Sequence, residues 1–295
     1  MPFTTTTAVP LYWISYGPAG APRLLVLHGG PGAPHDYLLP QMLELADRYQ
    51  LIFYDQRGSG QSRTVDQSPI TWRTHVEDLA QLIIELGLDP LSLVGYSWGG
   101  LLALLYAIEA YRGAGTRPVR MVLIDPAPTS RGARIAFETE FARRQNSDAV
   151  AKLREELAAS GLREKNHDAY RQRMFELSVA GYFGRLERAR ALTPFRVVGR
   201  IQKSVWESLG DYDLRNALST VRCPTLVIHG RQDPIPLESS EAVTQALPNA
   251  RLVVIDESGH VPYVEAPDVL FAAIRRFLDE TASRSLTSSP PPEAT

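Results

Sequence analysis

Short unbroken runs of apolar residues alternate along this chain with longer segments in which apolar positions recur at helical spacing. Unbroken apolar runs are typical of strands buried on both faces, and strands separated by helices favour a parallel sheet. The strands we expect span residues 24–27, 51–54, 91–94, 119–124, 225–228 and 251–255. The segment 9–16 is expected to add one or two antiparallel strands at an edge.

The helical segments between these strands complete a predicted α/β fold, in which a mostly parallel sheet has helices on both faces. The helices we expect span residues 36–49, 72–86, 98–110, 238–246 and 267–280. A chain of 295 residues has the length of one such domain, or of one domain that carries an insertion.

The alternation of strands and helices stops between about residues 128 and 217, where the chain is charged and helical in pattern. Long excursions in compact domains are usually functional, so we interpret 128–217 as a helical cap inserted into a core formed by 1–127 and 218–282. The alternative is a set of surface helices with no role at a site. The tail 283–295 is rich in Ser and Pro and is expected to be disordered.

A glycine-flanked serine follows the third of the apolar runs. Gly95 to Gly99 reads G-x-S-x-G, directly between the expected strand and an apolar helix. Such a sharp turn presents Ser97 at the end of the strand, and the N-terminus of the helix favours developing negative charge there. We therefore expect Ser97 to be a nucleophile; the alternative is an ordinary glycine-rich turn.

A second glycine-rich segment, HGGPG at 28–32, follows the first expected strand. Acyl transfer needs two backbone N–H groups aimed at the oxyanion, one of them from the residue after the nucleophile, Trp98. Pro31 has no N–H, so Gly30 is our choice for the other donor. Gly29 is the less favoured donor and is expected to lie against the substrate. The alternative for this segment is a simple tight turn.

A nucleophilic serine needs a base, and the order expected for this fold is serine, acid, histidine. Three histidines follow Ser97 in the chain. His167 lies in the charged segment, and His229 ends a strand as a packed residue would. His260 lies in the loop after the strand 251–255, late in the chain, and is our choice for the base.

The acid that orients the base is expected at the same sheet edge. Asp233 lies in the loop after the strand 225–228 and is our choice for this role. The competitor is Asp125, which directly follows the strand 119–124. Because Pro126 and Pro128 come next, at the entrance to the predicted cap, we interpret Asp125 as structural.

Five segments together resemble one family. They are HGGPG at 28–32, DQRGSGQS at 55–62, GYSWGG at 95–100, GRQD at 230–233 and SGHVP at 258–262. With them the chain resembles the proline iminopeptidase branch of the α/β-hydrolases, over about residues 11–278. The resemblance implies an α/β-hydrolase fold and removal of an N-terminal residue, often proline, from a peptide.

In that branch, glutamates of the cap bind the free α-amino group of the substrate. Trp206 and Glu207 resemble a Trp-Glu pair of the branch, so the resemblance makes Glu207 a candidate amine anchor. A buried ammonium needs a paired carboxylate. The alternative is that Glu207 is a solvated helix residue. In the segment 55–62, Asp55 and Arg57 are expected to fix the sheet end without touching substrate.

Composition narrows the function classes. A net charge of −2 gives no basic field for nucleic acid, and the lone Cys223 excludes an internal disulfide and suits the cytoplasm. The N-terminus lacks a secretory pattern, and the apolar stretch 101–108 is too short to span a membrane. No metal cluster or nucleotide loop is evident, so we expect no cofactor and a small-molecule or short-peptide substrate. The oligomeric state stays open.

Three functions are compatible with these residues. The leading hypothesis is a serine aminopeptidase of the proline iminopeptidase type. The second is a carboxylic ester or lactone hydrolase with the same triad, which an apolar cap interior would favour over an acidic one. The third is a ligand receptor that keeps a hydrolase-like pocket.

Overall fold

The computed structural model describes residues 2–287 as a seven-stranded sheet with helices on both faces, which confirms the predicted fold class. The strand order is β1-β3-β2-β4-β5-β6-β7, and all neighbouring strands are parallel except β1 and β3. The strands are β1 Trp13–Tyr16, β2 Arg23–Leu27, β3 Gln50–Tyr54, β4 Leu91–Tyr96, β5 Pro118–Ile124, β6 Thr225–Gly230 and β7 Ala250–Ile255. The antiparallel edge strand expected in 9–16 is β1.

Four of the five helices expected for the core form as continuous helices. They are α2 Trp72–Glu85, α3 Trp98–Tyr111, α10 Leu237–Ala246 and α12 Pro267–Thr287. The single helix expected at 36–49 was wrong, because this segment divides into η1 Asp36–Leu38, α1 Leu39–Met42 and η2 Leu43–Asp47. Pro40 lies in the first turn of α1, where its missing N–H is tolerated, whereas inside a longer helix its ring would clash with the preceding turn.

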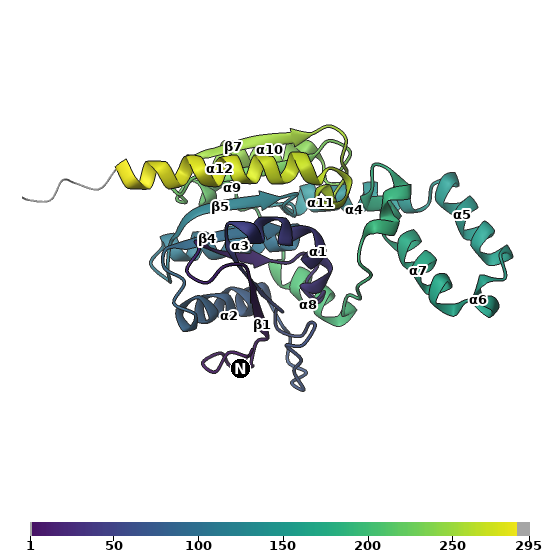
Figure 1. Ribbon diagram of the computed structural model, residues 1–295, viewed down its shortest axis with the longest axis horizontal. Coiled ribbons are helices and arrows are strands. Elements are labelled where there is room, and N and C mark those ends of the chain that lie inside the picture. Colours follow the sequence, from purple (N-terminus) through teal and green to yellow (C-terminus); the bar gives the residue numbers. More distant parts are fainter. Residues whose placement is uncertain (1, 288–295) are drawn as a thin grey trace, which may run out of the picture.

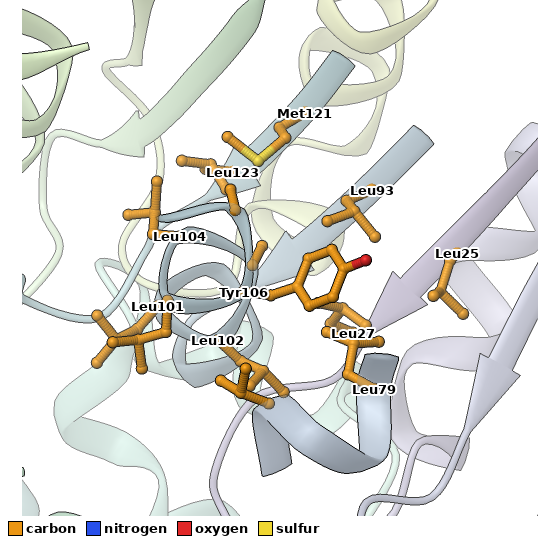
Figure 2. Close-up of a cluster of buried hydrophobic side chains, with 14 of the residues drawn as sticks. Leu25, Leu27, Leu79, Leu93, Leu101, Leu102, Leu104, Tyr106, Met121 and Leu123 are labelled. Atoms are coloured by element: carbon orange, nitrogen blue, oxygen red, sulfur yellow. The ribbon is translucent and has the colours of Figure 1, made fainter. Parts of the chain in front are cut away.

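Alternate residues of each central strand pack on opposite faces of the sheet, as its two-residue period requires. Leu25, Leu27 and Leu93 pack with side chains of α2 and α3 in one buried cluster, which Figure 2 shows from close by. Leu24, Val26 and Val94 pack in the other cluster, with α12 and the segment 36–47. Because both faces are covered, the strands contain the near-continuous apolar runs on which their prediction rested.

Between β5 and β6 the chain forms a layer of helices. They are α4 Arg131–Gln145, α5 Asp148–Ala159, α6 Leu162–Lys165, α7 His167–Ser178, η3 Ala180–Tyr182, η4 Leu186–Ala191, α8 Gly199–Leu209 and α9 Arg215–Leu218. Helices α5 to α7 project away from the sheet, and α8 returns to it (Figure 1). Ile201 and Val205 of α8 pack into the same cluster as α3. The division into a core and a cap at 128 and 217 remains our prediction.

The C-terminal end of the chain differs from the expected tail in one respect. Helix α12 continues to Thr287, past residue 283 where we expected disorder to begin. The rest of the predicted tail, 288–295, lies outside the described residues. Among residues 2–287, no helix is both long and apolar enough to pass through a bilayer.

Candidate active site

The turn between β4 and α3 holds Ser97 in an unusual backbone conformation. Its φ is 53° and its ψ is −119°, so the residue lies in the left-handed half of φ space that most side chains avoid. A Cβ on Gly95 would overlap the carbonyl oxygen of Gly99, and one on Gly99 would overlap that of Leu27. Glycine is therefore required on both sides of the serine, as the sequence pattern predicted.

The structure brings together the three residues that the sequence singled out for catalysis. Ser97 Oγ lies 2.9 Å from Nε2 of His260, and Nδ1 of His260 lies 2.8 Å from Oδ2 of Asp233. The second oxygen of Asp233 accepts a hydrogen bond of 2.7 Å from the backbone N–H of Ile235. This geometry fits a hydroxyl donating to a neutral imidazole whose other nitrogen donates to a carboxylate.

Aromatic rings enclose the imidazole of His260. The ring of Tyr182 stacks on it at 5.0 Å between centroids, and Tyr96 donates a hydrogen bond of 3.0 Å to the carbonyl of His260. Burial lowers the pKa of His260 below its ordinary value, so the imidazole is neutral at pH 7 and able to accept a proton. Burial also raises the pKa of Asp233, an effect that neighbouring hydrogen bonds oppose.

The alternative residues do not hydrogen-bond to Ser97 or to His260. Asp125 is fully buried just after β5, where it accepts a hydrogen bond of 2.8 Å from the N–H of Gly230 and forms none with His260. His229 is packed inside β6, with Nδ1 at 2.9 Å from Ser240 Oγ. His167 begins helix α7 of the cap. The observed hydrogen bonds therefore connect Asp233, and not Asp125, to His260, the histidine beside Ser97.

The two backbone donors chosen from the sequence lie on the wall of one cavity with Ser97. Gly30 and Trp98 line this cavity, and no protein acceptor within residues 2–287 binds their N–H groups. The N–H of Gly29 instead donates to Oη of Tyr37 at 2.8 Å. Gly29 is adjacent to the nucleophile, since its Cβ would lie 3.0 Å from that of Ser97, but it does not line the cavity. Gly30 is thus the available donor of the pair.

Gln56 is a residue whose importance the sequence did not reveal. Its Oε1 accepts a hydrogen bond of 2.8 Å from the indole N–H of Trp98, and its Nε2 donates one of 3.0 Å to the carbonyl of His28. One buried side chain therefore joins the two segments that carry the candidate oxyanion donors. Its place in the motif 55–62 was the one sequence feature that could have singled out Gln56, but the motif does not show which groups the side-chain amide binds.

The neighbours of Gln56 have the structural role that we expected. Asp55 accepts hydrogen bonds of 2.9 Å from the N–H of His35 and 2.7 Å from that of Gln61. Arg57 forms a two-point ion pair with Asp78 of α2. None of these side chains lines the cavity at Ser97. They fix the end of β3 and its loop.

Glu265, to which no sequence motif assigned a role, connects the histidine loop to the cap. Its carboxylate accepts a hydrogen bond of 2.7 Å from the N–H of Gly259, beside His260. It also accepts hydrogen bonds of 3.1 Å from the N–H of Gly184 and 2.9 Å from that of Arg185. A single carboxylate thus ties the position of His260 to the cap segment after η3.

The cavity above Ser97 has a volume of about 670 Å³ and walls rich in aromatic side chains. The cap contributes Phe137, Phe141, Phe175, Tyr182, Phe195 and Trp206. Two ion pairs of the cap also border it: Arg134 with Glu138 at 2.7 Å, and Lys203 with Glu207 at 3.8 Å. The Glu207 side chain is 66% exposed, so it lies on the cavity wall but is not enclosed.

This sheet topology, with a serine turn after β4, an acid after β6 and a histidine after β7, is that of an α/β hydrolase. The sequence model described as the alpha/beta hydrolase family matches residues 24–273, and the chain belongs to that family. It is 27% identical to a proline iminopeptidase of Saccharolobus solfataricus, over 94% of this chain and 92% of that protein.

Solved structures of hydrolases share the fold over nearly the whole chain. The proline iminopeptidase of Mycobacterium smegmatis has a TM-score of 0.71 and 22% identity, and covers 96% of this chain and 99% of its own. The enol-lactonase of Burkholderia xenovorans has a TM-score of 0.67 and 20% identity, and covers 94% of this chain and 100% of its own. The same fold thus occurs in hydrolases with different substrates, so the substrate must be argued from the cavity.

Proposed function

We propose that this protein is a serine aminopeptidase, which releases an N-terminal residue with an apolar side chain, such as proline, through an acyl-enzyme at Ser97. The observation that carries the proposal is one cavity that Ser97 and Glu207 both line, between walls rich in aromatic side chains. Aromatic walls suit an apolar ring, and a carboxylate suits the ammonium of a free N-terminus.

The chemistry follows from the distances at the strand ends. His260 takes the proton of Ser97 Oγ as the oxygen attacks the carbonyl carbon, while Asp233 holds Nδ1–H of the imidazole. The N–H groups of Gly30 and Trp98 bind the oxyanion. The imidazolium then gives its proton to the leaving amine, and water activated by His260 releases the acid from Ser97.

Recognition of the free amine is assigned to Glu207. Its present partner is Lys203, at 3.8 Å and with a side chain that is 76% exposed, which is a loose ion pair. A substrate ammonium can take the place of Lys203, because a loose and exposed ion pair costs little to open. Several curated relatives at similar identity are named proline iminopeptidase, which supports this substrate class.

A second candidate is a hydrolase of neutral esters or lactones with an apolar acyl group. The charges on the cavity wall favour it, because Arg134 and Lys203 balance the carboxylates of Glu138 and Glu207. A charge-balanced wall attracts an ammonium less than a wall with excess carboxylate does. The triad and the oxyanion donors serve both candidates equally.

The test compares prolyl and alanyl arylamides, their N-acetylated forms and short acyl esters. The proposal expects turnover of free-amine arylamides only, and loss of all turnover in Ser97→Ala. Glu207→Gln should raise KM for the arylamides about tenfold and change kcat little. The matched control is Glu155→Gln, which alters an exposed carboxylate of α5 away from the cavity. Cleavage of esters without arylamides would select the second candidate, and activity of Ser97→Ala would reject both.

A further inference from the structure

A second carboxyl group is buried beside the candidate triad, and the mechanism above does not use it. Asp125 follows β5 with a φ of 42°, and no part of its side chain reaches solvent. Its Oδ1 accepts a hydrogen bond of 2.8 Å from the N–H of Gly230. Its Oδ2 is buried and meets no hydrogen-bond donor within residues 2–287. An ionised carboxylate with an unpaired buried oxygen is costly, so this group calls for an explanation.

The groups around Asp125 do not supply that donor. One oxygen of Asp125, one oxygen of Asp233 and one ring nitrogen of His229 all lie within 4.8 Å of one another. Both nitrogens of His229 are occupied, Nδ1 at 2.9 Å from Ser240 Oγ and Nε2 at 3.1 Å from the carbonyl of Ile235. The ring also lies 3.7 Å from Oδ1 of Asp125, beyond hydrogen-bond distance, and burial lowers the pKa of His229, so a neutral His229 does not balance the charge of the carboxyls. Two buried carboxyls this close cannot both stay ionised at low cost.

We propose that Asp125 is a positioning residue that stays protonated and donates a hydrogen bond to Asp233, while its other oxygen accepts from Gly230. The inference rests on the proposed role of Asp233 as the acid that orients His260. It assigns the shared proton to the carboxyl that does not touch the histidine.

The hydrogen bonds explain why Asp233 is the ionised partner. Asp233 receives the N–H of Ile235 at 2.7 Å and faces Nδ1 of His260 at 2.8 Å, whereas Asp125 receives only the N–H of Gly230. More donors favour the charged form. Burial raises the pKa of Asp125 well above its ordinary value, which also favours a protonated Asp125.

The donated hydrogen bond has a consequence for the pH dependence of the enzyme. It stabilises the Asp233 carboxylate, so the coupled pair of Asp233 and His260 takes up a proton only at lower pH. The other titratable or charged groups that act on these two carboxyls are His229, Tyr96, Tyr263, Tyr182, Glu265 and Arg144. None of them is changed in the test below.

The test compares Asp125→Asn with Asp125→Ala. The amide of Asn reproduces both bonds, since its oxygen accepts from Gly230 and its N–H donates to Asp233, and Asn tolerates the positive φ of this position. Asp125→Asn should keep the acid limb of the parent's kcat/KM profile. Asp125→Ala lacks the donor and should move that limb upward by about one pH unit. Asp256→Asn, which alters an exposed carboxylate paired with Arg231, is the control for general charge effects.

The contrary outcomes are distinct. If Asp125 were ionised, both variants would remove a negative charge near His260, and both limbs would move downward. If Asp125 only packed, activity would fall in Asp125→Ala with no movement of the limb. Either result overturns the proposal. Should Asp125→Ala fail to fold, an infrared band of a protonated carboxyl at neutral pH must be present in the parent protein and absent in Asp125→Asn.

Labelling of Ser97 by a fluorophosphonate across the same pH range provides a readout without any substrate. It keeps the inference separate from the proposed function. If the parent protein is not labelled, or if Asp233→Asn is labelled as fast as the parent, the proposed triad is wrong whatever Asp125 does. If labelling follows the triad but arylamides are not cleaved, only the substrate class is wrong, and the limb of the labelling rate still tests Asp125.

Discussion

The strand ends and the cap enclose the same cavity, yet they hold their residues by different means. At the strand ends, Ser97 and His260 are set by a turn that only glycine permits and by hydrogen bonds to buried groups. In the cap, α4 contributes Phe137 and Phe141 to the cavity, but none of its residues is fully buried. The reacting atoms are therefore held in place by the main chain. The cavity wall that would select the substrate is formed by side chains on partly exposed helices of the cap.

This difference predicts which changes stop the chemistry and which redirect it. A side chain at the strand ends has few alternative positions, so its loss removes a function outright. A side chain on an exposed helix can shift when its neighbour changes, so its loss alters preference among substrates. The predictions below compare matched substitutions in the two regions.

The largest difference is expected between two serines that line the cavity, Ser97 at the strand ends and Ser178 in the cap. Ser97→Ala should lower kcat/KM by more than about 10⁴-fold, because the nucleophile is lost while the oxyanion donors remain. Ser178→Ala, at the end of α7, removes a hydroxyl that only donates to the carbonyl of Phe175 and should change kcat/KM by about twofold. Steady-state kinetics with circular dichroism of each variant would check this. Comparable losses in both would mean that the cap takes part in the chemistry.

The next effect concerns stability and compares two glycines. Gly99→Ala should destabilise the protein by more than about 3 kcal/mol, since its Cβ would overlap the carbonyl oxygen of Leu27. Gly132→Ala, in the first turn of α4, meets no atom within 4 Å and should be neutral or stabilise by up to about 1 kcal/mol. Urea unfolding measures both. A small loss for Gly99→Ala would show that the turn is not as constrained as its contacts indicate.

The strands and the residues at their ends could be predicted from the sequence far better than the contacts that involve the cap. The strands were predicted to within two residues at either end, because apolar runs between helical segments have one good interpretation in a sheet covered on both faces. Ser97, Asp233 and His260 could be placed together because each lies in the turn or loop after such a strand, and parallel strands end at one edge. The single helix predicted at 36–49 was wrong because Pro40 interrupts a segment whose apolar spacing fits a helix.

Contacts between distant segments could not be predicted in this way. Gln56 binds Trp98 through an amide whose reach depends on three loops meeting, and Glu265 binds Gly259 and Gly184 across the cap boundary. Asp125 was interpreted as structural, and only the three-dimensional arrangement reveals a second carboxyl beside Asp233. Such residues have no spacing rule, since their roles arise from packing rather than from a local pattern.

A moderate effect is expected from Gln56, the side chain that joins the two candidate oxyanion segments. Gln56→Leu keeps the size but removes the hydrogen bonds to Trp98 and His28, so the two N–H donors are held less firmly. We expect kcat to fall about tenfold with little change in KM. Gln67→Leu, an exposed change in the following loop, is the control. A rise in KM at constant kcat would instead place Gln56 in substrate binding.

The smallest change is expected when pH is varied during fluorophosphonate labelling of Ser97, which keeps the amine of a peptide out of the measurement. General-base catalysis needs the uncharged imidazole, and burial lowers the pKa of His260 from its ordinary value of about 6.5. With Asp233 held ionised by its hydrogen bonds, a lowered pKa leaves the base uncharged as the pH falls, so the labelling rate should fall by less than about twofold between about pH 7.5 and 6. A histidine with an ordinary pKa would lose about fourfold over this interval. A loss of that size would mean that water reaches His260, and that the strand ends are no better shielded than the exposed helices of the cap.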